Sequence, residues 1–258
     1  MKLKIASVET LELKKIIAVF NREIGRFVLF VFVLFFDSLY FAEHVTPSQL
    51  PINILMFLGF LKMYFRSTPR VKESMIYAVI IGFLGEHFFS RGLDMYTYRL
   101  ENVPHYVPLG HAALYGRILM FSKASVVRRN NQAIEQLFSY VIATLSLVYL
   151  IFFNDVFGFV MTLCVFLMLL KRPKDKLFFY AMYILVAILE IGGTAFGCWK
   201  WPNTAFGVFS FLPSHNPPSG ISLFYFLLDV SCFMVYKLRN KTTWNRWKHI
   251  KSIASNNF

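Results

Sequence analysis

The chain alternates between long apolar blocks and short polar segments, and the blocks set the first expectation about its fold. Their lengths approach the ~20 apolar residues that a helix needs to cross a bilayer. We expect an all-α membrane helix bundle with about eight transmembrane helices, and seven spans plus a re-entrant segment is the alternative. The expected spans are 25–43, 49–65, 73–90, 108–125, 135–153, 155–171, 176–194 and 219–237.

Polar residues interrupt the apolar pattern at both ends of this expected bundle. Residues 8–25 mix apolar side chains with acidic and basic ones, which is typical of an amphipathic helix on a membrane surface. A plain cytosolic extension of the first span is an equal alternative. The chain is therefore divided into a cytoplasmic amphipathic segment (1–25), a single transmembrane domain (26–237) and a basic cytoplasmic tail (238–258).

Composition supports a membrane location. Of the 258 residues, 57% are hydrophobic and 16% are charged, whereas soluble domains carry about 25% charged residues. The net charge of +13 is also found in proteins that bind nucleic acid. Here, however, the basic residues stand in short clusters between apolar blocks. We therefore expect a membrane lipid as partner, and no nucleic acid.

The basic clusters also predict the orientation. Lysine and arginine gather in cytoplasmic loops of membrane proteins, and here they fall on alternate sides of the spans. One side carries the clusters at 2–26, 62–72, 123–129, 171–176 and 237–251, and the other has only Arg91, Arg99 and Lys200. We expect an integral protein of a bacterial inner membrane with both termini cytoplasmic and residues 91–107 and 195–217 outside, within the longer stretches 85–117 and 190–229.

These two outer stretches share a pattern that indicates an internal repeat. Each has a glutamate at the end of a span, an aromatic-x-aromatic triplet, and a helix that begins at a proline with glycine two residues later. The matching residues are Glu86, Tyr96-Thr97-Tyr98, Pro108, Gly110 and Tyr115 in the first stretch and Glu190, Trp199-Lys200-Trp201, Pro218, Gly220 and Tyr225 in the second. We predict two parallel halves of four spans, about 26–130 and 131–237, related by an axis along the membrane normal. Transporters built this way place their sites at the repeat interface.

Ionisable residues within spans are the candidates for chemistry, because they are costly in lipid and usually face a cavity or a partner. Glu86 and Glu190 are the predicted acid and base, since burial would favour the protonated form of a carboxyl group. The alternative is that each glutamate only bonds nearby backbone or the aromatic triplet. His111 and Asp229 are further catalytic candidates, and Asp229 is expected to pair with Arg117 at similar depth.

Substrate-binding candidates lie in the outer loops around the two glutamates. The aromatic triplets place Tyr96, Tyr98, Trp199 and Trp201 there, and aromatic faces stabilise cations. Their alternative role is that of membrane-interface anchors. The other candidates are Asp94, His105 and Asn216, and for Asn216 a helix-capping role is the stronger expectation.

The histidines raise the question of a metal. His44, His87, His105, His111 and His215 all fall on the predicted outer side, and together with a glutamate such residues bind zinc. No HxxxH or HExxH spacing occurs among them. We therefore predict no cofactor, with zinc as the less favoured alternative.

A short motif orders Glu, Gly, aromatic-x-Tyr, Val-Pro and Pro-Leu-Gly, and is carried by Glu86, Gly92, Tyr96, Tyr98, Val103, Pro104, Pro108, Leu109 and Gly110. This motif resembles that of carotenoid-biosynthesis membrane proteins of the carotenoid hydratase and lycopene cyclase type. The resemblance covers about 25 residues and is echoed at 190–220. It implies an isoprenoid substrate whose double bond is protonated, with the cation captured by water or by ring closure. His111 departs from the motif, as does Asn-Pro-Pro in the second half.

Three functions follow as hypotheses. The first is a membrane enzyme of hydratase, cyclase or hydrolase type that acts on a lipid or isoprenoid through Glu86 and Glu190. The second is a transporter or lipid flippase that uses Arg117 and Asp229 near the midplane. The third is a structural or assembly subunit whose polar residues only bond the helices. Polar residues gathered toward the outer side favour the enzyme, because a transport site is expected near the midplane.

Overall fold

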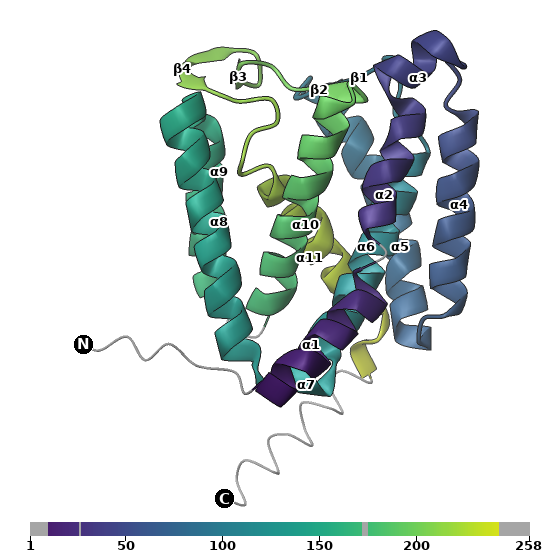
Figure 1. Ribbon diagram of the computed structural model, residues 1–258, viewed down its shortest axis with the longest axis vertical. Coiled ribbons are helices and arrows are strands. Elements are labelled where there is room, and N and C mark those ends of the chain that lie inside the picture. Colours follow the sequence, from purple (N-terminus) through teal and green to yellow (C-terminus); the bar gives the residue numbers. More distant parts are fainter. Residues whose placement is uncertain (1–9, 26, 172–174, 243–258) are drawn as a thin grey trace, which may run out of the picture.

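The computed structural model describes residues 10–25, 27–171 and 175–242. They form a bundle of helices with short strands gathered at one end (Figure 1). Helices make up 75% of the structure, which confirms the predicted helical bundle. The predicted N-terminal segment and basic tail fall partly outside the described residues.

Eleven α-helices and four short strands make up the described part of the chain. The helices are α1 (Thr10–Glu23), α2 (Phe27–Val33), α3 (Leu39–His44), α4 (Leu50–Phe65), α5 (Pro69–Glu86), α6 (Tyr106–Lys123), α7 (Ser125–Arg129), α8 (Asn131–Phe153), α9 (Val156–Leu170), α10 (Lys176–Ala195) and α11 (Ser222–Arg239). A 3-10 turn, η1 (Leu34–Asp37), follows α2, and a π-helical turn, η2 (His87–Gly92), follows α5. The strands are β1 (Thr97–Tyr98), β2 (Trp199–Lys200), β3 (Thr204–Ala205) and β4 (Phe209–Pro213).

Each predicted span overlaps a helix, yet eight full-length spans are not what the structure contains. Within the described ranges, only α8 and α10 are long and apolar enough to cross a membrane, with mean hydropathy of 1.9 and 1.8. Helices α4 and α9 are apolar but shorter. The first predicted span is divided into α2, η1 and α3, because the buried Asp37 ends η1 and binds side chains from other segments.

Local sequence explains several helix boundaries. Proline stands in the first turn of α4 and of α5, where its missing N–H leaves no bond unmade. Helix α8 ends at Phe153 and is followed by Asn154, whose φ of 54° is a left-handed conformation that asparagine tolerates better than most residues. The next residue, Asp155, caps α9 by accepting a hydrogen bond of 3.1 Å from the Gly158 amide. Each turn is therefore specified within a few residues.

Helix α6 lies at the centre of the bundle and packs on α4, α5 and α10. Most of its side chains are buried, including the small residues Ala112 and Ala113. Gly116 allows α5 to approach closely, because an added Cβ would lie 2.7 Å from the Met75 sulfur. Both glutamates of the predicted site lie on helices that pack against α6.

The predicted halves, about 26–130 and 131–237, differ in their elements. The first contains α2 to α7 and β1, and the second contains β2 to β4 and α8 to α11. Strand β1 lies between α5 and α6, β2 follows α10, and β1 pairs with β2 in an antiparallel ladder. The ladder thus joins the two halves at the strand end of the bundle (Figure 1).

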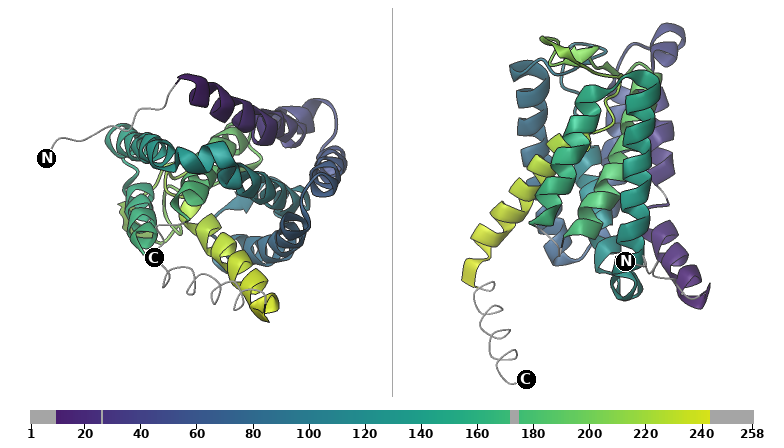
Figure 2. Two further views of the ribbon diagram at one scale, coloured as in Figure 1. Left: turned by 90° about the horizontal axis from the view of Figure 1, so that it is seen from below. Right: turned by 90° about the vertical axis from the view of Figure 1, so that its left-hand side faces the viewer.

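The opposite end of the bundle carries α1 and α7 (Figures 1 and 2). Glu12 of α1 pairs with Arg129 of α7 at 3.2 Å. Arg70 at the start of α5 lies 4.9 Å from the ring centroid of Tyr236 near the end of α11. The described basic clusters of the sequence therefore meet at this end, and the strands mark the other.

Candidate functional site

The β1–β2 ladder positions the two aromatic triplets. Thr97 lies opposite Lys200, and Tyr98 lies opposite Trp199, so the middle residues of the two triplets face each other. Side chains alternate between the faces of a strand. Thr97 and Lys200 are exposed, which leaves the four aromatic side chains on the buried face toward the two glutamates.

Glu86 is the last residue of α5 and is 3% exposed. Its Oε2 accepts hydrogen bonds from the hydroxyl groups of Tyr96 and Tyr98, the latter at 2.6 Å. The π-helical turn η2 begins at the next residue, and such turns occur frequently at functional sites. The two tyrosine hydroxyl groups of the first triplet therefore both donate to Glu86.

Glu190 on α10 is equally buried and is bound in the same way by the second triplet. Its Oε2 accepts from the indole N–H of Trp199 at 2.8 Å and from that of Trp201 at 3.1 Å. Its Oε1 accepts from the Tyr225 hydroxyl of α11 at 3.0 Å. The two glutamates are thus bound in a similar way, Glu86 by hydroxyl donors and Glu190 mainly by indole donors.

Both glutamates line one small cavity, together with the four aromatic side chains and Tyr225. Its volume is about 20 Å³, which is roughly the room that one water molecule needs. The rings of Tyr96 and Trp201 lie 4.4 Å apart between centroids and belong to opposite halves. The structure therefore brings the predicted acid, the predicted base and the predicted aromatic residues into one closed site.

Burial controls the protonation of the two tyrosines in β1 and the segment before it. For both Tyr96 and Tyr98, loss of solvent raises the pKa well above its usual value, and the negative charge of Glu86 raises the pKa further. Both hydroxyl groups therefore keep their protons at neutral and moderately alkaline pH, and they remain hydrogen-bond donors to Glu86.

His111 and Asp229 form a second buried polar pair beside this cavity. His111 Nε2 of α6 lies 3.3 Å from Asp229 Oδ1 of α11, and both side chains are almost fully buried. Neither makes a hydrogen bond to another described residue. The His111 ring lies 5.4 Å from the Tyr225 ring, and Tyr225 binds Glu190. A series of neighbouring titratable side chains thus extends from Asp229 through His111 and Tyr225 to Glu190.

The predicted pairing of Arg117 with Asp229 is wrong. Arg117 instead donates to Glu23 at 3.0 Å and to the Ser67 hydroxyl at 2.6 Å. Similar depth along the two helices is enough to bury both residues, but it does not determine which face a side chain occupies. Asp229 faces α6 at His111, and Arg117 faces α1 and α4.

Other predicted residues lie outside the cavity or support it from behind. Asp94 and His105 are exposed, and Asp94 has a φ of 46° in a turn. Asn216 accepts a hydrogen bond of 2.9 Å from the Trp201 amide, so it holds the second triplet in place instead of capping α11. Asp94 and His105 are thus not brought to the carboxyl groups.

The histidines among the described residues are spread over the strand end of the bundle. His44 and His87 are exposed and bond the backbone carbonyls of Tyr40 and Phe83. His215 bonds the Pro217 carbonyl at 3.1 Å. Over residues 10–25, 27–171 and 175–242, no group of three or more His, Cys, Asp or Glu side chains is arranged to hold a metal ion.

Three residues near the site were not predicted to contribute to it. Tyr225 was matched to Tyr115 in the repeat, and only the tertiary structure reveals its bond to Glu190. Asp37 binds Arg99 and Tyr106, and Asp155 accepts from the amides of His215 and Ser219. Asp37 follows α2 and fixes the segment that leads into α6, and Asp155 follows α8 and fixes the segment that leads into α11. In the sequence, the only indication of these roles is that each aspartate stands alone between two apolar blocks.

Gly193 is required for the indole of Trp199 to reach Glu190. A Cβ at this position would lie 2.1 Å from Cζ2 of that ring. We expect Gly193→Ala to displace the indole and to lower the free energy of unfolding by roughly 1–3 kcal/mol, as overpacking does. Near-ultraviolet circular dichroism and an unfolding titration in detergent measure both effects. Gly59→Ala is the control, because a Cβ added at Gly59 would meet nothing within 4 Å; equal stability of the two variants would contradict the prediction.

Comparisons of the chain with protein-family models, curated proteins and solved structures find no significant match. The resemblance to carotenoid-biosynthesis proteins therefore stays a hypothesis, and the function must be argued from the geometry of the site.

Proposed function

We propose that this chain is an integral membrane enzyme that acts on a lipid or isoprenoid by acid–base chemistry at Glu86 and Glu190. The observation that carries the proposal is the shared cavity, in which two buried carboxyl groups from equivalent helices are each held by aromatic donors. Two like charges in one buried cavity repel, which favours a state in which one carboxyl group is protonated and the other ionised. In that state the protonated carboxyl group can act as an acid and the ionised one as a base.

The outward-facing surface of the bundle supports a membrane location. Only 11% of the most apolar 18-residue segment of α8 is buried. The exposed side chains of this helix include Leu147, Ile151 and Phe152. Soluble monomers rarely expose contiguous apolar patches larger than a few hundred Å². Helix α10 is similarly apolar, but 67% of its most apolar 18-residue segment is buried inside the same bundle. Lipid around α8 accounts for an apolar helix that is exposed where α10 is buried.

The distribution of basic residues gives the proposed orientation. The end with α1 and α7 carries the described basic clusters, and the strand end carries Arg91, Arg99 and Lys200. By the positive-inside rule the α1 end faces the cytoplasm. The cavity of Glu86 and Glu190 then lies toward the outer side of the membrane.

Cysteine labelling tests the orientation. In a background without the three native cysteines, a Cys at Asn203 should react with an impermeant reagent added from outside, and a Cys at Arg128 should not. Both positions are exposed in the folded chain, so access to the reagent depends on the side of the membrane. Labelling of Arg128→Cys alone would reverse the orientation and place the cavity toward the cytoplasm.

The chemistry proposed for the cavity is protonation of a carbon–carbon double bond. The neutral carboxyl group gives its proton to one carbon, which leaves a cation on the other carbon and a carboxylate on the enzyme. The second carboxylate then accepts a proton, either from a water that adds to the cation or from a carbon next to it. Faces of Tyr96 and Trp201 are suited to stabilise the cation. A cavity of this size holds water and no lipid, so substrate entry requires these rings to move.

Two other functions compete with the enzyme. The transporter hypothesis depended on Arg117 and Asp229 acting together, and the structure separates them. A purely structural role is favoured by the number of hydrogen bonds that each glutamate accepts. Lipid mass spectrometry of cells with and without the chain tests the enzyme: a lipid gained or lost in proportion to expression supports it, and unchanged lipid profiles with abundant folded protein contradict it.

A further inference from the structure

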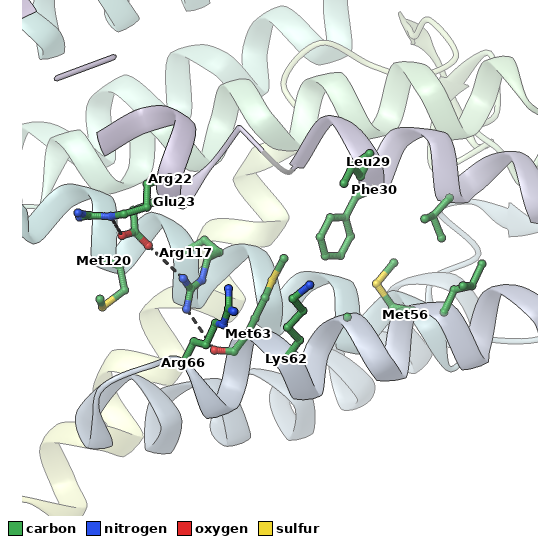
Figure 3. A pocket seen from close by; sticks show the side chains of 13 residues that line it. Arg22, Glu23, Leu29, Phe30, Met56, Lys62, Met63, Arg66, Arg117 and Met120 are labelled. Carbon is green, nitrogen blue, oxygen red and sulfur yellow. Dashed lines mark hydrogen bonds and ion pairs between the residues drawn. The ribbon is translucent and has the colours of Figure 1, made fainter. Parts of the chain in front are cut away.

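A large pocket lies away from the two glutamates, between α1, α2, α4 and α6 (Figure 3). Its volume is about 570 Å³, within the ~300–1,000 Å³ of typical ligand sites. Charged side chains gather at one end of the pocket, and Leu29, Phe30 and Met56 lie at the other end (Figure 3). The pocket is therefore amphipathic along its length.

The charged end has a clear excess of positive charge. Arg22, Lys62, Arg66 and Arg117 line it, and Glu23 is the single acidic residue among the lining side chains. Four cations and one carboxylate leave a net charge of +3. Glu23 is already engaged by Arg22 at 2.7 Å and by Arg117 at 3.0 Å. Lys62 and Arg66 form no ion pair with an acidic side chain of the described chain, so two cations face the pocket without a carboxylate.

The apolar end explains which kind of anion fits. Beyond the cations, the lining consists of side chains such as Val33 and Leu55 and of Gly59, whose added Cβ would meet nothing within 4 Å. A free inorganic anion would leave this apolar region empty. A lipid with a phosphate headgroup fills both ends, because its headgroup meets the arginines and lysine while its tail follows α2 and α4. Basic pockets between membrane helices on the cytoplasmic side bind anionic headgroups in other proteins.

We propose that this pocket binds a phosphate-bearing lipid, with the phosphate between Lys62, Arg66 and Arg117 and the tail against Phe30 and Met56. Arginine suits this role because its planar guanidinium binds phosphate oxygens in pairs. The exposed side chains of Lys62 and Arg66 are free to move toward a headgroup at the membrane surface.

The tail end of the pocket leads toward the glutamates. Phe30 and Met56 also line a cavity of about 50 Å³ that includes His111, Glu190 and Tyr225. A tail that passes between these two residues approaches the carboxyl groups from the cytoplasmic half of the bundle. This step rests on the proposed function: it makes the bound phospholipid or prenyl phosphate a substrate, whereas binding itself requires no catalysis.

Native mass spectrometry of the detergent-solubilised full chain tests the binding site. The probe is dioctanoyl phosphatidylglycerol, and dioctanoylglycerol, which has the same tails and no phosphate, is the comparison. We expect a single phosphatidylglycerol per chain that excess inorganic phosphate does not displace. Lys62→Gln combined with Arg66→Gln should weaken binding by about tenfold or more, because charge-assisted contacts to phosphate are lost.

Matched variants separate a defined site from general attraction to charge. Lys14→Gln combined with Lys171→Gln removes two exposed cations outside the pocket lining and should leave binding unchanged. Gly59→Leu keeps every charge but fills the apolar end, and it should also prevent binding. Glu86→Gln should bind lipid normally, so loss of catalysis and loss of binding are distinguished.

Three results would overturn the proposal. Equal loss in the two double variants would mean that net charge alone attracts the lipid. Equal binding of dioctanoylglycerol would mean that the phosphate is not recognised, and displacement by inorganic phosphate would indicate a small-anion site. Thermal unfolding of each variant in detergent confirms that it is folded before binding is compared.

Discussion

Replacing Glu190 or Glu86 with glutamine is expected to abolish the lipid product while leaving the yield of folded protein nearly unchanged. Both tyrosine hydroxyl groups bind the same oxygen of Glu86, and both indoles bind the same oxygen of Glu190. A glutamine carbonyl oxygen in that position accepts the same two bonds. At position 190 the amide then donates to the Tyr225 hydroxyl, which accepts as readily as it donates. Glutamine thus preserves the bonds and removes the exchangeable proton.

The expected loss of turnover is ~10²–10⁴-fold for each glutamine variant, the usual contribution of a general acid or base. Lipid mass spectrometry measures the product, and chromatography in detergent measures the folded yield. Full activity in both glutamine variants would remove the acid–base mechanism.

Alanine at the same positions separates chemistry from structure. It leaves two or three buried donors without an acceptor, at about 1–3 kcal/mol for each unsatisfied group. We therefore expect Glu190→Ala to lower the folded yield more than Glu86→Ala, since three donors bind Glu190 and two bind Glu86. If the glutamates are only structural, glutamine retains activity and alanine alone is damaging.

Asp37→Ala is expected to cause the largest loss of stability. This aspartate is fully buried and accepts from Arg99 at 2.5 Å, from Gln49 at 2.9 Å and from Tyr106 at 2.8 Å. The Arg99 side chain is only 7% exposed, so the variant leaves a buried cation without its partner. Breaking a buried ion pair in this way costs about 3–5 kcal/mol. Unfolding by sodium dodecyl sulfate titration in mixed micelles measures the change.

Glu43→Ala is the matched control for Asp37→Ala. Glu43 lies six residues further on, in α3, and is exposed, so its replacement should change stability by less than about 0.5 kcal/mol. Similar stability of the two variants would mean that the bonds of Asp37 to Gln49, Arg99 and Tyr106 do not stabilise the fold.

The sequence predicted that Glu86 and Glu190 lie together because similar residues surround both, and the structure places them at one cavity. Glu86 with its tyrosine triplet and Glu190 with its tryptophan triplet have similar spacing, and the β1–β2 ladder brings the two triplets together. Hydrophobic blocks likewise predicted where helices occur, since an apolar block needs internally bonded backbone wherever it is buried. Helix positions and the spacing of residues around the two glutamates both follow from the order of residues along the chain, so the sequence predicts them.

Features that depend on the direction of a side chain were not predictable in the same way. Arg117 and Asp229 were assigned similar depths, but they point to different neighbours, Glu23 and His111. Length was also overestimated: η1 and α3 replace the second part of the first predicted span. The partner of a buried charge is set by tertiary packing, which hydropathy does not encode.

The register of the β1–β2 ladder has a consequence for how the two glutamates can differ. If two identical chains met across a two-fold axis, their triplets would pair as these do, centre opposite centre, and both carboxyl groups would have identical surroundings. Within one chain that equality is broken, because Tyr98 stands opposite Trp199 and the Tyr96 ring packs against that of Trp201. A phenol both donates and accepts, whereas an indole only donates. Glu86 therefore has two phenol neighbours that can pass a proton onward, whereas Glu190 has such a neighbour only at Oε1, where Tyr225 donates, and has indoles at Oε2.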